Sequence, residues 1–149
     1  MPQKFDYFVV FAEMRTGSNF LEANLNALEG VTCHGEAFNP HFISYPNCET
    51  TLGWTQQRRD GDALGFLDCF CRAEGALNGF RYFHDHDPRV LDQILDDPRC
   101  AKIILTRNPA ESYVSHQIAK RTGQWKLTNV KRRKTGLATI NAEEFARHV

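Results

Sequence analysis

The sequence predicts an α/β fold, with a parallel sheet covered by helices on both faces. Short apolar runs rich in β-branched residues alternate along the chain with segments whose apolar residues have helical spacing. Two of these apolar runs end in polar, cation-bearing turns that open a helix, at 15–18 and 107–109. In parallel sheets ligands bind at the carboxyl ends of the strands, so we expect both turns at one edge. With 149 residues, 42% of them hydrophobic, the chain predicts one domain over 1–149.

The first half of the chain is expected to begin with a buried strand, because residues 6–12 are nearly all apolar and rich in β-branched and aromatic side chains. A helix over 18–28 follows, with Ser18 as its N-cap. Residues 31–35 predict a short second strand. The prolines, glycine and polar side chains of 37–60 indicate a long irregular segment, and such segments often carry function.

The second half continues the alternation of helices and strands. Its expected elements are helices over 62–75, 87–97 and 108–120 and strands over 79–84 and 101–106. Pro88 and Pro109 stand at the first position of their helices, where proline fits well. Residues 121–140 predict a loop or hairpin, and Asn141 is expected to cap a last short helix.

Charge is balanced over the whole chain but not along it. Eighteen basic residues match eighteen acidic ones, yet the segment 120–134 contains seven Lys and Arg residues and no Asp or Glu. A local basic run in a neutral protein favours docking of one anionic ligand over general binding of nucleic acid.

The five cysteines are odd in number and have neither zinc-ribbon nor thioredoxin spacing, which indicates reduced thiols. The N-terminus has no apolar signal-peptide core, and no apolar run reaches the roughly 20 residues of a membrane span. We therefore expect a cytoplasmic protein without a membrane span, either monomeric or a homodimer.

The stretch Arg15-Thr16-Gly17-Ser18-Asn19, between the first strand and the first helix, predicts an anion-binding turn. The first N–H groups of a helix are unpaired, and its dipole favours negative charge at that end. Gly17 lets the backbone approach an oxyanion, while the neighbouring side chains add hydrogen-bond donors. A loop for ATP or GTP with magnesium needs a second glycine and a following lysine, which are absent. A strand–turn–helix joint with a capping serine is the alternative explanation.

A second motif, Arg107-Asn108-Pro109 with Ser115 eight residues after the arginine, follows the strand expected at 101–106. Taken together and in this order, the two motifs resemble the sulfotransferases that use 3′-phosphoadenosine 5′-phosphosulfate (PAPS), over about residues 6–134. The resemblance implies a P-loop-like parallel sheet whose first loop binds the 5′-phosphosulfate and whose second motif binds the 3′-phosphate. The residues that it assigns to the cofactor are Arg15, Thr16, Gly17, Ser18, Asn19, Arg107 and Ser115.

Arg15 stands where many members of this family have lysine, and an arginine there is similar to the bacterial carbohydrate-type branch. The stretch CHGEAFNP at 33–40 is similar to the acceptor side of that branch, whose glutamate is the proposed base. The resemblance thus implies Glu36 and Arg15 as catalytic residues and Phe38 as a substrate contact. The implied acceptor is the hydroxyl of a carbohydrate or glycolipid.

The stretch GFRYFHDH at 79–86 resembles the family's Gly-Phe-Lys strand, with Arg81 in place of the lysine as a residue that faces the substrate. Other branches place a catalytic histidine shortly after this strand, so His84 and His86 are alternatives to Glu36 as the base. On a strand the two histidines would share one face and could suggest a metal site, but a polar strand end explains them as simply, and no metal is expected. A carboxylate base would need burial that raises its pKa toward neutrality.

Members of the family generally continue into a further basic, glycine-containing loop that closes over the nucleotide, whereas this chain ends at Val149. We expect either that the C-terminal portion of the fold is missing or that the segment 120–134 does part of its work. The main competing interpretation is a non-catalytic nucleotide- or nucleic-acid-binding α/β module that uses the sheet and this basic segment. A kinase-like P-loop protein ranks third, because the lysine is absent.

Overall fold

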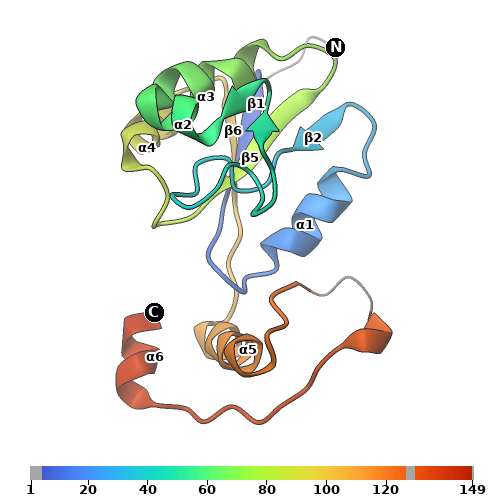
Figure 1. Cartoon of the computed structure of the whole chain (residues 1–149), viewed down its shortest axis with the longest axis vertical. Coiled ribbons are helices and arrows are strands. Elements are labelled where there is room, and N and C mark those ends of the chain that lie inside the picture. The colour runs from blue at the N-terminus through green and yellow to red at the C-terminus, as the bar shows by residue number, and fades with distance from the viewer. Residues whose placement is uncertain (1–4, 127–129, 149) are drawn as a thin grey trace.

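The computed structural model describes residues 5–126 and 130–148 of the chain. A four-stranded, fully parallel sheet forms its centre, with the strands in the order β2-β5-β1-β6 (Figure 1). The strands are β1 (Tyr7–Phe11), β2 (Val31–Cys33), β5 (Leu77–Tyr82) and β6 (Cys100–Ile104). The α/β fold with a parallel sheet is confirmed, and all four strands lie close to their predicted positions.

Strand β1 lies between two strands that come from far along the chain. Its residues pair with β5 in the register Tyr7↔Asn78 and with β6 in the register Tyr7↔Cys100. β2 and β6 form the two edges of the sheet. Because all four strands run parallel, the turns that follow β1 and β6 lie at the same carboxyl edge.

Helices cover both faces of the sheet, as predicted (Figure 1). They are α1 (Ser18–Leu25) on one face and α3 (Ala63–Arg72), η1 (Pro88–Val90) and α4 (Leu91–Asp96) on the other. On the α1 side, Leu21 and Leu25 pack with Phe8 and Val10 of β1. Successive strand residues point to opposite faces, so a strand that is covered on both sides is apolar along its whole length.

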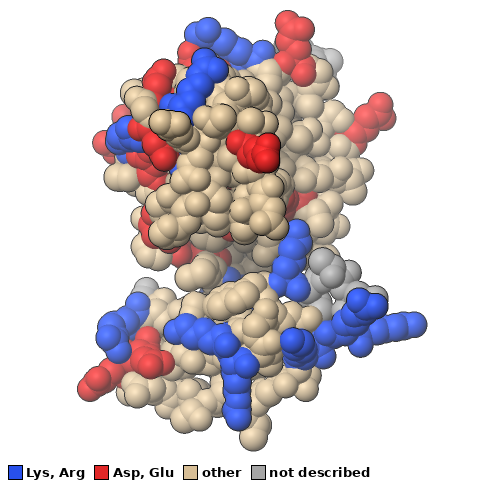
Figure 2. Space-filling model, in the orientation of Figure 1, with Lys and Arg blue, Asp and Glu red and all other residues tan. Residues whose placement is uncertain are grey.

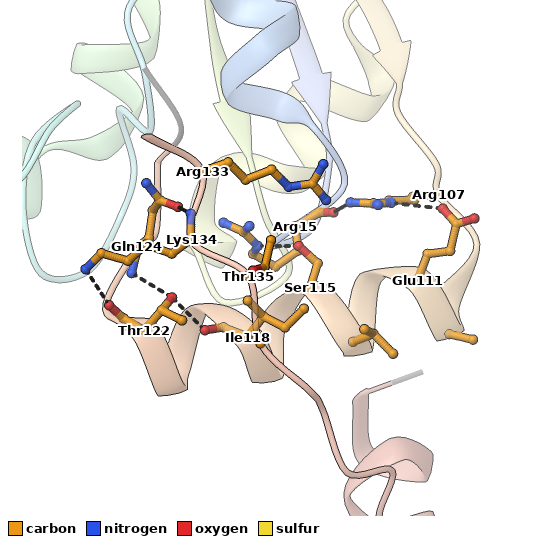
Figure 3. A pocket seen from close by; sticks show the side chains of 13 residues that line it. Arg15, Arg107, Glu111, Ser115, Ile118, Thr122, Gln124, Arg133, Lys134 and Thr135 are labelled. Carbon is orange, nitrogen blue, oxygen red and sulfur yellow. Dashed lines mark hydrogen bonds and ion pairs between the residues drawn. The ribbon is translucent and has the colours of Figure 1, made fainter. Parts of the chain in front are cut away.

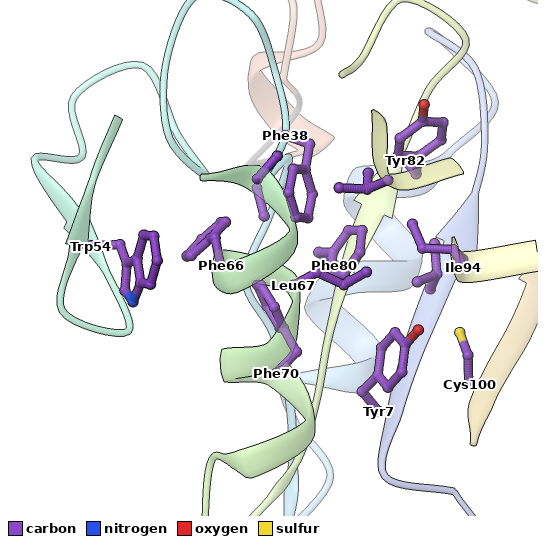
Figure 4. Close-up of a cluster of buried hydrophobic side chains, with 14 of the residues drawn as sticks. Tyr7, Phe38, Trp54, Phe66, Leu67, Phe70, Phe80, Tyr82, Ile94 and Cys100 are labelled. Carbon is purple, nitrogen blue, oxygen red and sulfur yellow. The ribbon is translucent and has the colours of Figure 1, made fainter. Parts of the chain in front are cut away.

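The larger core lies between the sheet and α3 and is rich in aromatic side chains (Figure 4). Phe38, Phe66, Phe70 and Phe80 are all fully buried, and the ring centroids of the last two are 4.8 Å apart. Burial of each such ring contributes about 1.5–3 kcal/mol, and tilted ring pairs add to it. Phe38, which the resemblance assigns to the substrate, is instead a core residue, with its ring 4.9 Å from that of Phe80.

The segment 37–60 is not irregular throughout, contrary to the prediction. It contains the hairpin β3 (Thr50–Thr51) and β4 (Trp54–Thr55) and the helix α2 (Gln56–Gly61). Leu52 and Gly53 form the two-residue turn, with φ of 49° and 77°, and positive φ at both positions suits the twist of a hairpin. Thr55 then caps α2, because its Oγ1 accepts the N–H of Arg58 at 3.2 Å. Two-residue strands are too short for an alternating pattern, so no periodic signal marked them.

The C-terminal elements α5 (Pro109–Thr122), η2 (Val130–Arg132) and α6 (Ala142–His148) lie beyond the carboxyl ends of the strands (Figure 1). Asn108 and Asn141 cap α5 and α6 through their side-chain oxygens, and the cap at Asn141 is as predicted. The two helices pack through Tyr113 and Phe145, whose ring centroids are 5.5 Å apart. Between them the described residues form η2 and extended chain, without a hairpin.

Candidate functional site

The turns after β1 and β6 meet at the carboxyl edge of the sheet, as predicted (Figure 3). Arg107 donates through Nη1 to the carbonyl oxygen of Arg15 at 2.9 Å, across 92 residues of sequence. Arg15 in turn donates through Nε to Oγ of Ser115 on α5 at 3.0 Å. The two predicted motifs are therefore directly connected and form one cationic site.

The turn 15–19 differs in one detail from the prediction. Gly17, with φ 97°, is the N-cap of α1 and offers no capping side chain, so the predicted cap at Ser18 is wrong. The Ser18 hydroxyl is buried and instead accepts a hydrogen bond from Nη1 of Arg81 at 3.0 Å. Thr16 is tied to the turn itself, since its Oγ1 donates to a carbonyl three residues earlier at 2.6 Å. Without a side-chain cap, the N–H groups of the first turn can bind an anion.

Arg15 occupies the centre of this site in an uncommon conformation. Its φ of 67° lies in the left-handed region, and such outliers in non-glycine residues concentrate at ligand sites. Besides Ser115, its guanidinium donates through Nη1 to the carbonyl oxygen of Trp125 at 2.6 Å. Partial burial and, after it, the charge of Arg107 lower the pKa of Arg15 below its ordinary value. Two adjacent guanidinium groups at a sheet edge favour an anion between them.

One cavity at the site, of about 560 Å³, lies along α5 and is called the α5 cavity below (Figure 3). Its polar lining residues are Arg15, Arg107, Glu111, Ser115, Thr122, Gln124, Arg133, Lys134 and Thr135. Lys134 is anchored there by its Nζ, which donates to the carbonyl oxygen of Thr122 at 2.9 Å. Part of the basic segment 120–134 thus reaches the second motif. In Figure 2, most of the charged side chains visible on the half of the molecule that carries α5 and η2 are Lys or Arg.

A second cavity, of about 540 Å³, lies beside α1 and is called the α1 cavity. Its polar and charged lining residues are Arg15, Ser18, Asn19, Glu36, Arg81, Arg107 and Lys126. Gly17 also lines it, while Met14, Phe20 and Trp125 supply an exposed apolar wall. Arg15 and Arg107 line both cavities, so a single ligand that spans them would contact both guanidinium groups.

Glu36 is a half-buried carboxylate surrounded by hydrogen-bond donors. Its Oε2 accepts from Nδ2 of Asn39 at 2.8 Å and lies 3.5 Å from Nε2 of His86, while its Oε1 lies 3.4 Å from Nη2 of Arg81. Burial acts to raise the pKa of Glu36, but the contact with His86, the charge of Arg81 and the hydrogen bond from Asn39 outweigh it. The pKa of Glu36 is therefore below its ordinary value, contrary to the expectation that burial would raise it.

Glu22 of α1 is a buried partner of this network that the sequence did not reveal. Its Oε2 lies 2.7 Å from Nε of Arg81, an ion pair in which the N–H is not aligned for a hydrogen bond. Its Oε1 accepts the hydroxyl of Tyr45, and burial together with this contact raises the pKa of Tyr45. Ser18 and Glu22 are four residues apart on α1 and so share a helix face. This spacing was the signal in the sequence that could have placed Glu22 near the anion-binding turn.

The two histidines after β5 occupy different environments. β5 ends at Tyr82, so His84 and His86 lie in the following turn and do not share a strand face. The side chain of His84 is 74% exposed and pairs with Glu13 at 2.7 Å, a hydrogen bond that raises the pKa of His84. The side chain of His86 is fully buried beside Glu36. The structure therefore brings His86, but not His84, to the candidate base.

No family model, curated protein or solved structure matches this chain. Within residues 5–126 and 130–148, no helix is both long and apolar enough to cross a membrane. The same residues contain no group of three or more His, Cys, Asp or Glu side chains placed to hold a metal ion.

Proposed function

We propose that this chain is a PAPS-dependent sulfotransferase with a P-loop-like sheet, which transfers a sulfuryl group to a hydroxyl of a carbohydrate or glycolipid. The observation that carries the proposal is the pair of cavities that share Arg15 and Arg107. A nucleotide with phosphate groups at both its 5′ and 3′ positions needs cationic groups at two places, and each cavity also has cations of its own, Arg81 and Lys126 in the α1 cavity and Arg133 and Lys134 in the α5 cavity.

The 5′-phosphosulfate is assigned to the α1 cavity. There the uncapped first turn of α1 offers N–H groups, Gly17 allows close approach, and Arg15 supplies a charged fork. The 3′-phosphate is assigned to the α5 cavity, where Arg107 and Ser115 come from the second motif. Arg133 and Lys134 add positive charge to that cavity, which supports the idea that the basic segment helps to enclose the nucleotide.

Glu36 and Arg81 lie on the wall of the α1 cavity that would face the transferred group. The acceptor hydroxyl gives its proton to Glu36 and bonds to sulfur, while the bond from sulfur to the 5′-phosphate breaks and the phosphate leaves with the electron pair. Negative charge then grows on the leaving phosphate, where Arg15 and the helix N-terminus stabilise it. As in phosphoryl transfer, the protein contributes mainly position and electrostatic stabilisation.

Calorimetric titration of adenosine 3′,5′-bisphosphate against AMP tests the nucleotide assignment. The wild type is expected to prefer the bisphosphate, and Arg107→Ala is expected to remove that preference by deleting a charged hydrogen-bond partner worth about 1.5–3 kcal/mol. Arg72→Ala is the matched control, because Arg72 is a 79% exposed arginine on α3, where its ion pair is with Asp68. If Arg107→Ala bound both nucleotides as the wild type does, the assignment would be wrong.

The same titration separates this proposal from a nucleic-acid-binding module. Such a module would bind single-stranded oligonucleotides with steep salt dependence and would show no preference for a 3′-phosphate. Formation of the bisphosphate from PAPS, followed with a panel of sugars and glycolipids, then identifies the acceptor.

A further inference from the structure

Glu36 presents its two carboxylate oxygens to different surroundings. Oε2 accepts from the amide of Asn39 at 2.8 Å and faces Nε2 of His86 at 3.5 Å. Oε1 lies 3.4 Å from Nη2 of Arg81, whose Nε is in turn paired with Glu22. Among the described residues, two groups compete for the lone pairs of Oε2, whereas one approaches Oε1.

Backbone N–H groups fix the donor character of both neighbours of Oε2. Oδ1 of Asn39 accepts the N–H of His41 at 2.9 Å, so the Asn39 amide nitrogen must face Glu36. Nδ1 of His86 accepts the N–H of Phe83 at 3.2 Å, so the neutral imidazole carries its proton on Nε2. The ring of Phe83 stacks on His86 with centroids 5.0 Å apart and holds the imidazole in this orientation.

Nε2 of His86 is buried and has no well-aligned hydrogen-bond partner among the described residues. A buried donor without a partner is unfavourable, and hydrogen bonds in a catalytic site are often long before the substrate binds. The Glu36 carboxylate is the acceptor that this donor faces. On the side of Glu36, the charged groups near the pair are Arg81 from β5 and, behind it, Glu22 from α1. On the side of His86, a cavity is lined by His86 together with the charged residues Arg59, Asp60, Asp85 and Asp87.

We propose that His86 is a positioning residue which, with Asn39, holds Oε2 of Glu36 so that Oε1 takes the proton of the acceptor hydroxyl. This inference rests on the sulfotransferase function proposed above. A proton on Oε2 would face two donors. Oε1 belongs to a side chain that lines the α1 cavity, and within residues 5–126 and 130–148 the donor that approaches it is Arg81. His86 is thus a hydrogen-bond donor to the base and not the base itself.

Two substitutions of His86 separate the roles of its ring nitrogens. His86→Asn keeps an acceptor near the position of Nδ1 for the Phe83 N–H but removes the donor at Nε2. His86→Gln keeps a donor near the position of Nε2 and loses the acceptor. Removal of a donor to a carboxylate raises the pKa of that carboxylate. His86→Asn should therefore raise the pKa of Glu36 by about one unit, whereas in His86→Gln the pKa of Glu36 should stay near that of the wild type.

The pKa of Glu36 is measured by carbon-13 NMR titration of its side-chain carboxyl, and the acid limb of the kcat/KM profile should move to higher pH by the same amount. His84→Asn, at the exposed histidine two positions away, is the matched control and should move neither. The proposal would be overturned if Glu36 had the same pKa in His86→Asn as in the wild type, or if both His86 variants shifted the pKa of Glu36 equally.

Nitrogen-15 NMR of the His86 imidazole in the wild-type protein gives a test that does not depend on whether a variant folds. The expected spectrum has a protonated Nε2 and an unprotonated Nδ1, and the opposite tautomer would overturn the proposal. A wild-type chain that forms no sulfated product from PAPS would contradict the proposed function instead. The NMR titration of Glu36 would still decide whether His86 holds the carboxylate.

Discussion

Glu36 is a carboxylate whose surroundings stabilise its charge in spite of burial. Burial opposes ionisation, but the donors from His86, Arg81 and Asn39 lower its pKa below the ordinary value. The group is therefore ionised throughout the neutral range and is ready to accept a proton. A base of low pKa is weak, so in the proposed sulfuryl transfer the proton would move to Glu36 only as the acceptor oxygen bonds to sulfur and becomes acidic.

At the residue scale, Glu36→Gln keeps the shape of the side chain and removes its basicity. Turnover is expected to fall by roughly 10²–10⁴, while the affinity for adenosine 3′,5′-bisphosphate stays close to that of the wild type. Steady-state kinetics and calorimetry on the same preparation measure both quantities. Glu74→Gln, at an exposed position between α3 and β5, is the control. Unchanged turnover in Glu36→Gln would show that the base is another group.

At the element scale, α2 holds in place the loop that carries Glu36. Arg59 of α2 is 1% exposed and donates through Nη1 to the carbonyl oxygens of Ala37, at 2.9 Å, and Phe42, at 2.8 Å. Its charge is balanced by Asp60, whose Oδ1 accepts from Nε and Nη2. A short helix thus fixes both ends of the chain segment directly after Glu36.

Arg59→Ala leaves two carbonyl groups without their donor and is expected to destabilise the fold by about 2–4 kcal/mol. Turnover per folded molecule should also fall, because the segment after Glu36 loses its anchor. Urea unfolding and kinetics measure the two effects. Gln57→Ala, at an exposed position of the same helix, should change stability by less than about 0.5 kcal/mol. Equal stability of the two variants would contradict the anchoring role.

The longer elements of the fold could be predicted because their signals are local. The apolar run at 6–12 and the Asn108-Pro109 pair that opens the helix expected over 108–120 are properties of neighbouring residues, and the structure places β1 and α5 there. The turn at Leu52 could not be predicted, because positive φ at a leucine is imposed by the hairpin and has no mark of its own in the sequence. Propensity gives way to tertiary context at such positions.

The site was predictable only where topology alone brings residues together. Arg15 and Arg107 follow parallel strands of one sheet, so their proximity follows from the fold class. The partners of Arg81 were not predictable, because the burial of Glu22 depends on which face of α1 meets the sheet. The resemblance alone assigned Phe38 to the substrate, and it could not show that the Phe38 ring turns into the core while Glu36, two residues earlier, lines the α1 cavity.

At the scale of the whole molecule, the neutral net charge conceals a strong separation. The seven cations of 120–134 are balanced by a net negative charge elsewhere, and Arg133 and Lys134 from that segment line the α5 cavity. A charged region beside a binding site attracts oppositely charged ligands over distances comparable to the Debye length, about 10 Å at 0.1 M salt.

The association rate of adenosine 3′,5′-bisphosphate is therefore expected to fall about tenfold between low and high salt, roughly 0.05 M and 0.5 M. Stopped-flow measurement of ligand association gives this rate directly. The double variant Arg133→Gln/Lys134→Gln should show a weaker dependence on salt, while Arg72→Gln on α3 should behave as the wild type. Association that is independent of salt would show that the basic segment does not guide the ligand.

The position of β1 between β5 and β6 sets the order in which this chain can fold. β1 is made early, but its first residue pairs with Asn78 and Cys100, which are made much later. At a synthesis rate of about 5–20 residues per second, the interval before the first partner exists is on the order of ten seconds. Phe8, Val9 and Val10 must stay unpaired on the ribosome during that time, which exposes them to chaperones and to premature aggregation. The strand that precedes Arg15 thus spends this interval without either of its neighbours in the sheet.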